Sequence, residues 1–229
     1  MGNYVDIADV RAEGFDEATY PDYTDPRVTR AITLAESYVE TVTGQRFYRP
    51  AAAEVLKLDG HGRDLLHLTK AICQGDDQVS KVELGRIGPR EISLDDVVVY
   101  NGAGDRRNPK LAFDPQPGSM EQIWPEGRQN VRITGWFGFT DYDGALVGDL
   151  RWFTPPEIVD CVLRVVAIAL PLLDDPESTD RARAGRVLTE RTRARSITYG
   201  KLTTGGPTGD PQIDGTLARF RRPAAGYVV

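Results

Sequence analysis

Residues that could carry out chemistry are few in this sequence and form no familiar catalytic pattern. The two histidines, His61 and His67, lie six residues apart with no third candidate ligand, so we interpret both as structural. The sequence has no GxSxG motif, no Walker A motif and no glycine-rich loop leading from a strand into a helix. We therefore predict no catalytic residue, no metal and no cofactor, and a protein that is not an enzyme.

Carboxylates are the next group with chemical potential. Adjacent acids occur at 76–77, 95–96 and 174–175, and Asp141 and Asp143 flank Tyr142. Hydrolases hold two carboxylates across a cleft, whereas adjacent acids in turns diverge, so we expect solvated loop residues. The stretch 141–144 resembles the start of a calcium loop, but the remainder of the twelve-residue pattern is missing.

The two cysteines, Cys73 and Cys161, lie far apart in apolar segments, and neither belongs to a CxxC pair. This spacing excludes a zinc site on ligand count, and it predicts two buried, reduced thiols. An aromatic cluster spans residues 136–153 and could be mistaken for a platform on which bases stack. No basic residue interleaves its first part, 136–142, so we expect packing in the core or at a subunit interface.

Charge is distributed unevenly along the chain. Residues 181–229 carry ten basic and three acidic groups, a net charge of +7, so residues 1–180 carry −13 of the total −6. An acidic body with a basic C-terminal region predicts that this region meets an acidic partner. The arginines of 181–195 could bind phosphates, but pairing with the acidic body of a neighbouring copy is the preferred interpretation.

Two segments have the caps and the period of helices. Asp25 and Pro26 begin the first helix and Gly44 ends it. Its apolar stripe consists of Val28, Ile32, Ala35, Val39 and Val42. The second begins at a capping box, 154–157, and residues 158–170 are apolar around most of its circumference. Such a helix must lie at the centre of the fold or under another subunit, and we expect like copies to cover it.

Between these helices the apolar period changes to two, which predicts strands. The runs 55–58 and 65–68 surround the turn 59–62 and predict a hairpin. Further strands are expected at 79–84, 97–100, 110–113 and 130–137. After the second helix, a third helix is expected at 177–188, an extended segment at 193–202, a linker at 205–209 and a short helix from Asp210.

These patterns predict an α+β fold with a helical core, an inserted β-rich subdomain and an extended C-terminal arm. The predicted parts are residues 1–48 and 152–193 for the core, 49–151 for the insertion, and 194–229 for the arm. No apolar run is long enough to span a membrane and no signal sequence is present, so we expect a soluble protein made in the bacterial cytoplasm.

Several segments, taken in order, resemble the head-tail connector (adaptor) proteins of tailed siphophages and gene transfer agents. The opening 4–14, the helix ending in Thr43-Gly44-Gln45-Arg46-Phe47, and the strand 128–141 leading into 154–158 are similar to segments of that family. So are the extended segment 189–199 and the terminal helix 213–223, which ends in Phe220-Arg221-Arg222-Pro223. The resemblance covers nearly the whole chain, although the β insertion is longer than in minimal helical members.

The resemblance implies a structural protein of the virion, located in the neck of a bacteriophage particle and taking part in virus assembly. It implies a homo-oligomeric ring of about twelve copies, a dodecamer, below the portal. The implied partners are the portal protein, further copies, and stopper or tail proteins. Genomic DNA would pass through the channel without specific binding, because an acidic body repels it.

We predict that the arm grips the portal or a neighbouring copy, with 205–209 as its hinge. Arginine and aromatic side chains are common interface hot spots. The candidates are Arg191, Arg193, Arg195, Tyr199, Arg219, Phe220, Arg221, Arg222 and Tyr227. The alternatives are another neck or tail-completion protein of the stopper type, and a nucleic-acid-binding protein that uses the arginine-rich segment.

Overall fold

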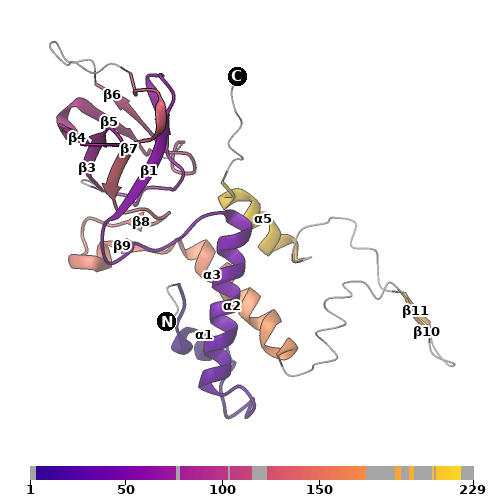
Figure 1. Cartoon of the computed structure of the whole chain (residues 1–229). Coiled ribbons are helices and arrows are strands. Elements are labelled where there is room, and N and C mark those ends of the chain that lie inside the picture. The colour runs from indigo at the N-terminus through magenta and orange to yellow at the C-terminus, as the bar shows by residue number, and fades with distance from the viewer. Residues whose placement is uncertain are drawn as a thin grey trace. The chain divides into compact units, whose positions relative to one another are not determined.

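The computed structural model describes residues 4–75, 78–102, 104–114, 123–173, 189–191, 196–198, 208 and 210–222. It contains both helices and antiparallel sheets, which confirms the predicted α+β class (Figure 1). The chain divides into two compact units. The helical unit contains the residues up to Val42 and Pro156–Arg219, and the β-rich unit contains Thr43–Pro155 with the described residues after Arg219.

Within the described residues, the helical unit contains four helices and a short two-stranded ribbon. The helices are α1 (Ile7–Ala12), α2 (Asp25–Thr43), α3 (Pro156–Leu172) and α5 (Pro211–Phe220), and the ribbon pairs β10 (Thr189–Arg191) with β11 (Ser196–Thr198). Asp6 begins α1 with a capping box, because its carboxylate accepts from the amide of Asp9 at 2.9 Å and the Asp9 carboxylate accepts in return at 2.8 Å.

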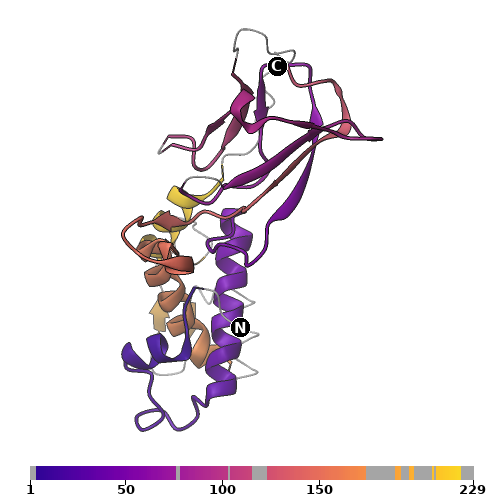
Figure 2. The ribbon, with the colours of Figure 1, turned by 90° about the vertical axis from the view of Figure 1, so that its left-hand side faces the viewer.

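The long helix α2, seen along its full length in Figure 2, buries the predicted stripe. Val28, Ile32, Ala35 and Val39 are buried, and Val42 is half-buried. Gly44 follows the helix with φ +67°, a left-handed conformation that glycine adopts at low cost. The predicted start and end of this helix are confirmed.

The apolar helix α3 buries one broad face within a single chain. Its fully buried residues are Ile158, Cys161, Val162, Val166 and Leu170. Its exposed side carries Glu157, Asp160, Arg164 and Ile168. In the single chain Val159, Leu163 and Val165 are only half-buried and Ile168 is 45% exposed, so the expectation that like copies cover the rest of this helix stays a prediction.

The predicted capping box of α3 is also different. The hydroxyl of Thr154 donates to the carbonyl of Phe47 at 2.9 Å, and α3 begins at Pro156. The carboxylate of Glu157 pairs with Arg219 at 3.1 Å. The residue types are those of a cap, but both side chains are used in tertiary contacts.

The β-rich unit contains a four-stranded and a three-stranded antiparallel sheet. The first has the order β1 (Glu54–Gly60), β7 (Gly127–Gly135), β3 (Val79–Leu84) and β4 (Arg90–Ile92). The second has the order β2 (Leu65–His67), β6 (Lys110–Phe113) and β5 (Val97–Tyr100). Short elements complete the unit: β8 (Asp141–Tyr142), β9 (Trp152–Phe153), and the 3-10 helices η1 (Leu94–Asp96) and η2 (Gly148–Arg151).

The predicted hairpin across 59–62 is wrong. β1 pairs with β7 and β2 pairs with β6, so the turn leads from one sheet into the other. Apolar alternation shows that a segment is a strand with one buried face, but it does not identify the strand's partner. The other predicted strands are present close to their expected bounds.

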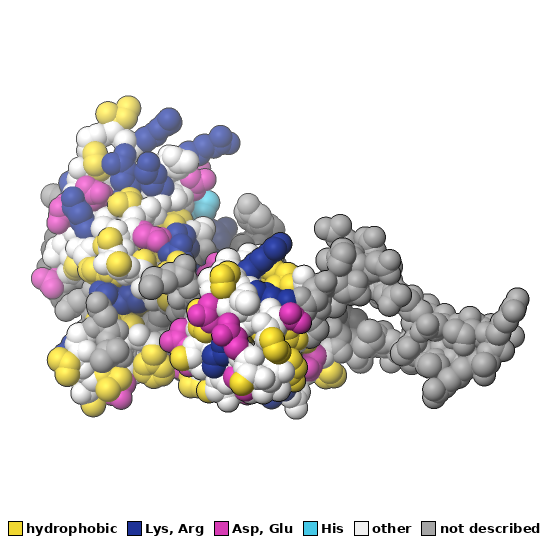
Figure 3. Space-filling model, turned by 90° about the horizontal axis from the view of Figure 1, so that it is seen from below, with side chains coloured by type: hydrophobic (Ala, Val, Ile, Leu, Met, Phe, Trp, Pro, Cys, Tyr) yellow, Lys and Arg dark blue, Asp and Glu magenta, His cyan; other side chains and the backbone are white. Residues whose placement is uncertain are grey.

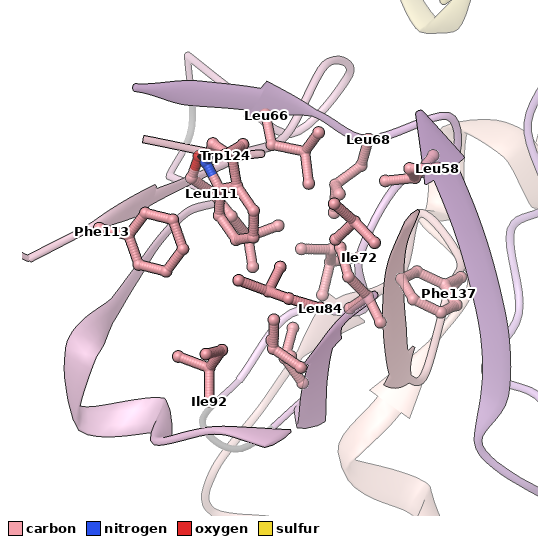
Figure 4. Close-up of a cluster of buried hydrophobic side chains, with 14 residues drawn as sticks. Leu58, Leu66, Leu68, Ile72, Leu84, Ile92, Leu111, Phe113, Trp124 and Phe137 are labelled. Carbon is pink, nitrogen blue, oxygen red and sulfur yellow. Dashed lines mark hydrogen bonds between the residues drawn. The ribbon is translucent and has the colours of Figure 1, made fainter. Parts of the chain in front are cut away.

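The core of the β-rich unit combines side chains from both sheets (Figure 4). Trp124 is fully buried in it and stacks on Phe113 with ring centroids 4.3 Å apart. Its indole nitrogen donates to the carbonyls of Asp64 and Leu111 at 3.1 and 3.2 Å. Both the ring and its polar nitrogen are therefore accommodated, as a buried tryptophan requires.

Candidate assembly surface

The terminal helix α5 carries the predicted contact residues Arg219 and Phe220, Arg221 and Arg222 follow it, and most of its length is packed in the helical unit. Asp210 caps it, with its carboxylate accepting from the amide of Gln212 at 2.8 Å. Ile213 and Leu217 are fully buried. On the α3 side, Gln212 accepts from Arg164 at 2.7 Å. The predicted helix is confirmed, but it does not project from the unit as a free arm.

The end of α5 is fixed by contacts in the β-rich unit. The ring of Phe220 meets Phe47 and Phe139 edge-to-face, with centroids 5.9 and 5.4 Å apart. The side chain of Gln45 donates to the Phe220 carbonyl at 2.5 Å. Arg222 donates from its backbone to Thr43 at 2.9 Å and from its guanidinium to the carbonyl of Leu68. Burial lowers the pKa of the Arg222 guanidinium below its usual value.

The predicted contact residues therefore differ in how accessible they are. Phe220 is buried and Arg222 is half-buried, whereas Arg219 and Arg221 are exposed. The backbone of Arg191 lies in β10. Four of the predicted residues lie outside the described residues: Arg193, Arg195, Tyr199 and Tyr227. Most of the predicted hinge and the predicted helix at 177–188 also lie outside them.

Arginines from distant parts of the sequence cover the aromatic cluster. The guanidinium of Arg49 lies between two indole rings, 4.6 Å from the centroid of Trp136 and 4.1 Å from that of Trp152. Arg106 lies 4.2 Å from the ring of Phe139. These cation–π contacts occupy the ring faces that stacked bases would need. No local pattern indicated these contacts, because Arg49 and Arg106 lie 87 and 33 positions before their nearest ring partners Trp136 and Phe139.

The remaining candidates for chemistry have structural roles. Both cysteines are buried free thiols, and burial raises the pKa of each to about 11. Asp141 accepts from Arg106 at 2.9 Å, and Asp143 accepts from the amide of Ala145 at 2.9 Å. Among the residues that the structure describes, no group of three or more potential ligands could hold a metal ion.

The two histidines are accessible in the β-rich unit. His61 is exposed in the turn after β1, and His67 is exposed in β2, with its Nδ1 3.4 Å from the side-chain nitrogen of Asn108. In the described ranges, no helix has both the length and the apolarity that crossing a membrane requires.

An acidic surface lies at the start of the helical unit, over α1 and the loop that leads to α2. Residues 4–25 hold seven acidic side chains and a single basic one, Arg11. Arg11 pairs with Asp25 at 3.0 Å and with Glu17 at 3.6 Å, and it also donates to two backbone carbonyls. Figure 3 looks onto this end of the unit and shows acidic side chains among apolar ones. The acidic half of the predicted charge split is therefore exposed.

The arrangement of elements has a counterpart among solved structures. The chain shares its fold with a chain of the structure described as "Neck of empty GTA particle computed with C6 symmetry". The alignment covers 98% of this chain and 92% of that chain, with a TM-score of 0.52 and 12% sequence identity. No family model matches the sequence, and no curated protein matches it either.

Proposed function

We propose that this protein is a structural subunit of the neck of a tailed phage or gene transfer agent particle, of the head-tail connector (adaptor) type. In that role it sits below the portal, joins capsid to tail and continues the DNA channel. The observation that carries the proposal is the fold shared almost from end to end with a neck chain. The likeness covers 98% of this chain and 92% of the neck chain.

The proposed assembly is a closed ring of about twelve copies. The neck that contains the similar chain was computed with C6 symmetry, with which rings of six and of twelve copies are both compatible. A head-to-tail ring needs two different surfaces on each copy. The acidic N-terminal surface is one candidate, and the sequence after residue 180, with a net charge of +7, supplies the opposite charge.

The net charge also suits a channel through which genomic DNA passes without specific binding. The chain carries a net charge of −6, and like charge repels the phosphate backbone. In the region that the structure describes, Arg49 and Arg106 cover ring faces of Trp136, Trp152 and Phe139 that stacked bases would need. Stopper and tail proteins are the proposed partners on the side away from the portal.

The proposed portal contacts now centre on exposed arginines. Arg219 and Arg221 are exposed at the end of α5. The other proposed portal contacts lie outside the described residues: Arg193, Arg195, Tyr199 and Tyr227. Deleting 205–229, the most direct removal of the arm, would take Ile213, Leu217 and Phe220 out of the core. A shorter truncation after Arg222 keeps this packing, so it separates loss of binding from loss of folding.

A pull-down with purified portal rings tests the role. Tagged portal should retain the full chain. The double variant Arg219→Glu/Arg221→Glu should be retained more weakly, because its glutamates repel the acidic portal groups with which the two arginines are proposed to pair. The matched control is Arg128→Glu/Arg63→Glu in the β-rich unit, which should bind like the wild type. Failure of the full chain to bind portal at all would refute the role, and equal binding by both double variants would refute the contact residues.

A further inference from the structure

The three-stranded sheet of the β-rich unit ends in a strand with one unpaired edge. β5 pairs with β6 through the register Val97↔Phe113 to Tyr100↔Lys110. The sheet order is β2-β6-β5, and no described strand lies on the other side of β5. Its outer backbone groups are therefore available to a further strand, as those of any sheet edge are.

The side chains of β5 are unusual for a strand at an edge. Natural edge strands are protected by charges, prolines or bulges, but β5 reads Val-Val-Val-Tyr. Val98, Val99 and Tyr100 are 36, 40 and 43% exposed. The register places Val98 beside Ala112, which in turn lies beside Leu65, also 37% exposed. One outward row of this sheet, Leu65–Ala112–Val98, is thus apolar, and the next row on the same face is His67–Lys110–Tyr100.

A hollow of about 370 Å³ opens beside the same strand. Leu94, Val97 and Val99 line it from the side of β5, and Ile72 and Val79 line it from the other side. The side-chain oxygen of Asn101 also borders this hollow, is buried, and has no hydrogen-bond partner among the described residues. A buried acceptor in this state is stabilised by an incoming N–H donor.

The helical unit contains a strand pair that is incomplete by itself. β10 and β11 pair over only three positions, from Thr189↔Thr198 to Arg191↔Ser196. No third described strand joins them, and Ile197 is the one apolar residue in the two strands. A two-stranded ribbon of this length is marginally stable in water and needs a sheet or a helix to pack on.

We propose that the β10–β11 ribbon of one copy adds to the free edge of β5 in a second copy. The added ribbon extends the sheet β2-β6-β5, covers the apolar outward row and brings N–H donors to the hollow beside Asn101. Charges at the two partners are complementary. Asp95 and Asp96 directly precede β5, and Arg191, Arg193 and Arg195 lie within and between the ribbon strands.

The contact is heterologous, because each copy donates a ribbon and receives another at a different surface. Contacts of this kind propagate around a symmetry axis and close into a ring. The inference rests on the proposed ring, and it specifies the elements that join neighbouring copies.

Cross-linking between two variants, each with one added cysteine, tests the contact. Val98→Cys with one affinity tag and Thr198→Cys with another are mixed with portal rings and treated with a short bismaleimide. We expect a covalent heterodimer that carries both tags and is absent when either variant is used alone. Wild-type chain is the control for Cys73 and Cys161, which are buried.

A charge placed on the edge provides a second measurement. Val98→Lys sets a cation against the arginines of the ribbon and should weaken self-association by about tenfold or more. Val55→Lys, at a 56% exposed valine of edge strand β1, is the matched control and should assemble normally.

The outcomes separate the inference from the proposed function. Rings that form on the portal without the heterodimer, and with no effect of Val98→Lys, overturn the strand pairing and leave the neck role intact. A chain that carries both Val98→Cys and Thr198→Cys and that cross-links only within itself also overturns the strand pairing. If the chain neither self-associates nor binds portal, both proposals are wrong.

Discussion

At the scale of single residues, Phe220 illustrates how a side chain suited to an interface can instead belong to the core. Its neighbours in sequence are arginines, which favoured a contact role. Its ring is packed against Phe47 and Phe139, more than 80 positions away in the sequence. Composition identified the residue as important, but only the three-dimensional contacts show that it fixes the end of α5.

Replacement of this ring should destabilise the protein. Phe220→Ala removes both edge-to-face contacts from a buried site, and we expect the free energy of unfolding to fall by about 3–5 kcal/mol. Urea denaturation followed by tryptophan fluorescence measures this change. Arg221→Ala, at the exposed next residue, should change stability by about 0.5 kcal/mol or less. Equal stability of Phe220→Ala and wild type would contradict the described packing.

The two thiols should be inert in the folded protein. Burial raises the pKa of Cys73 and of Cys161 to about 11, so both remain protonated at pH 8 and shielded from reagents. We expect a chromogenic disulfide reagent to detect no thiol in native protein and both thiols in 8 M urea. Rapid labelling of either cysteine without denaturant would show that its segment is open.

Glu54 should make stability depend on pH in the acid range. Hydrogen bonds from Lys70 and Arg46 hold the pKa of its carboxyl below the usual 4.5. A lowered pKa stabilises the fold above about pH 4.5, and this contribution is lost as the pH falls through the folded-state pKa. Glu54→Gln should therefore be less stable than wild type at pH 7, with the difference shrinking below pH 4.5.

Denaturation curves of both proteins between pH 3 and pH 7 measure this effect. Glu126→Gln, at an exposed carboxyl of the same unit, serves as the control and should follow the wild type throughout. A Glu54→Gln difference that stays constant over the whole range would exclude the ion pairs as its cause.

At the scale of elements, the sequence predicted helices better than strand partners. Asp6, Asp25 with Pro26, and Asp210 mark helix starts because caps act locally, within a few residues. The apolar stripe of α2 follows from its period for the same reason. The strand pairs β1–β7 and β2–β6 join residues more than 40 positions apart, and local patterns contain no information about such pairing.

The candidate surfaces show the same limit. The apolar character of β5 is evident in the sequence, but its position at a sheet edge depends on the pairing of β6 between β2 and β5. Trp124 lies outside every predicted strand, yet it is the largest fully buried side chain among the residues that the structure describes. Its importance depends on contacts with Asp64, Leu111 and Phe113, which come from three other segments.

The inner strand β7 should not accept even one methyl group at Gly135, its last residue. A Cβ there would lie 2.4 Å from the backbone carbonyl oxygen of Gln78, on the neighbouring strand segment. We expect Gly135→Ala to lower the free energy of unfolding by about 1–3 kcal/mol, because the backbone must shift. Gly102→Ala, where no atom lies within 4 Å, is the matched control. Unchanged stability of Gly135→Ala would mean that the strands separate easily at this position.

At the scale of the whole molecule, the single chain buries one broad face of α3 but leaves Ile168, an apolar sheet edge and a charge split unmatched. The case for assembly depends on the shared fold and on β5. The acidic N-terminal surface and the basic C-terminal region can pair with each other, either within one copy or between neighbouring copies. In a closed head-to-tail ring, the acidic surface of each copy pairs with the basic region of its neighbour.

The mass of the complex formed with the portal tests the neck role most directly. Size-exclusion chromatography with light scattering, applied to the chain, to portal rings and to their mixture, gives the number of bound copies from the chain mass of 25.3 kDa. We predict a single complex that is heavier than the portal ring by about twelve chains. Portal rings and a 25.3 kDa monomer that elute separately from the mixture would contradict the account.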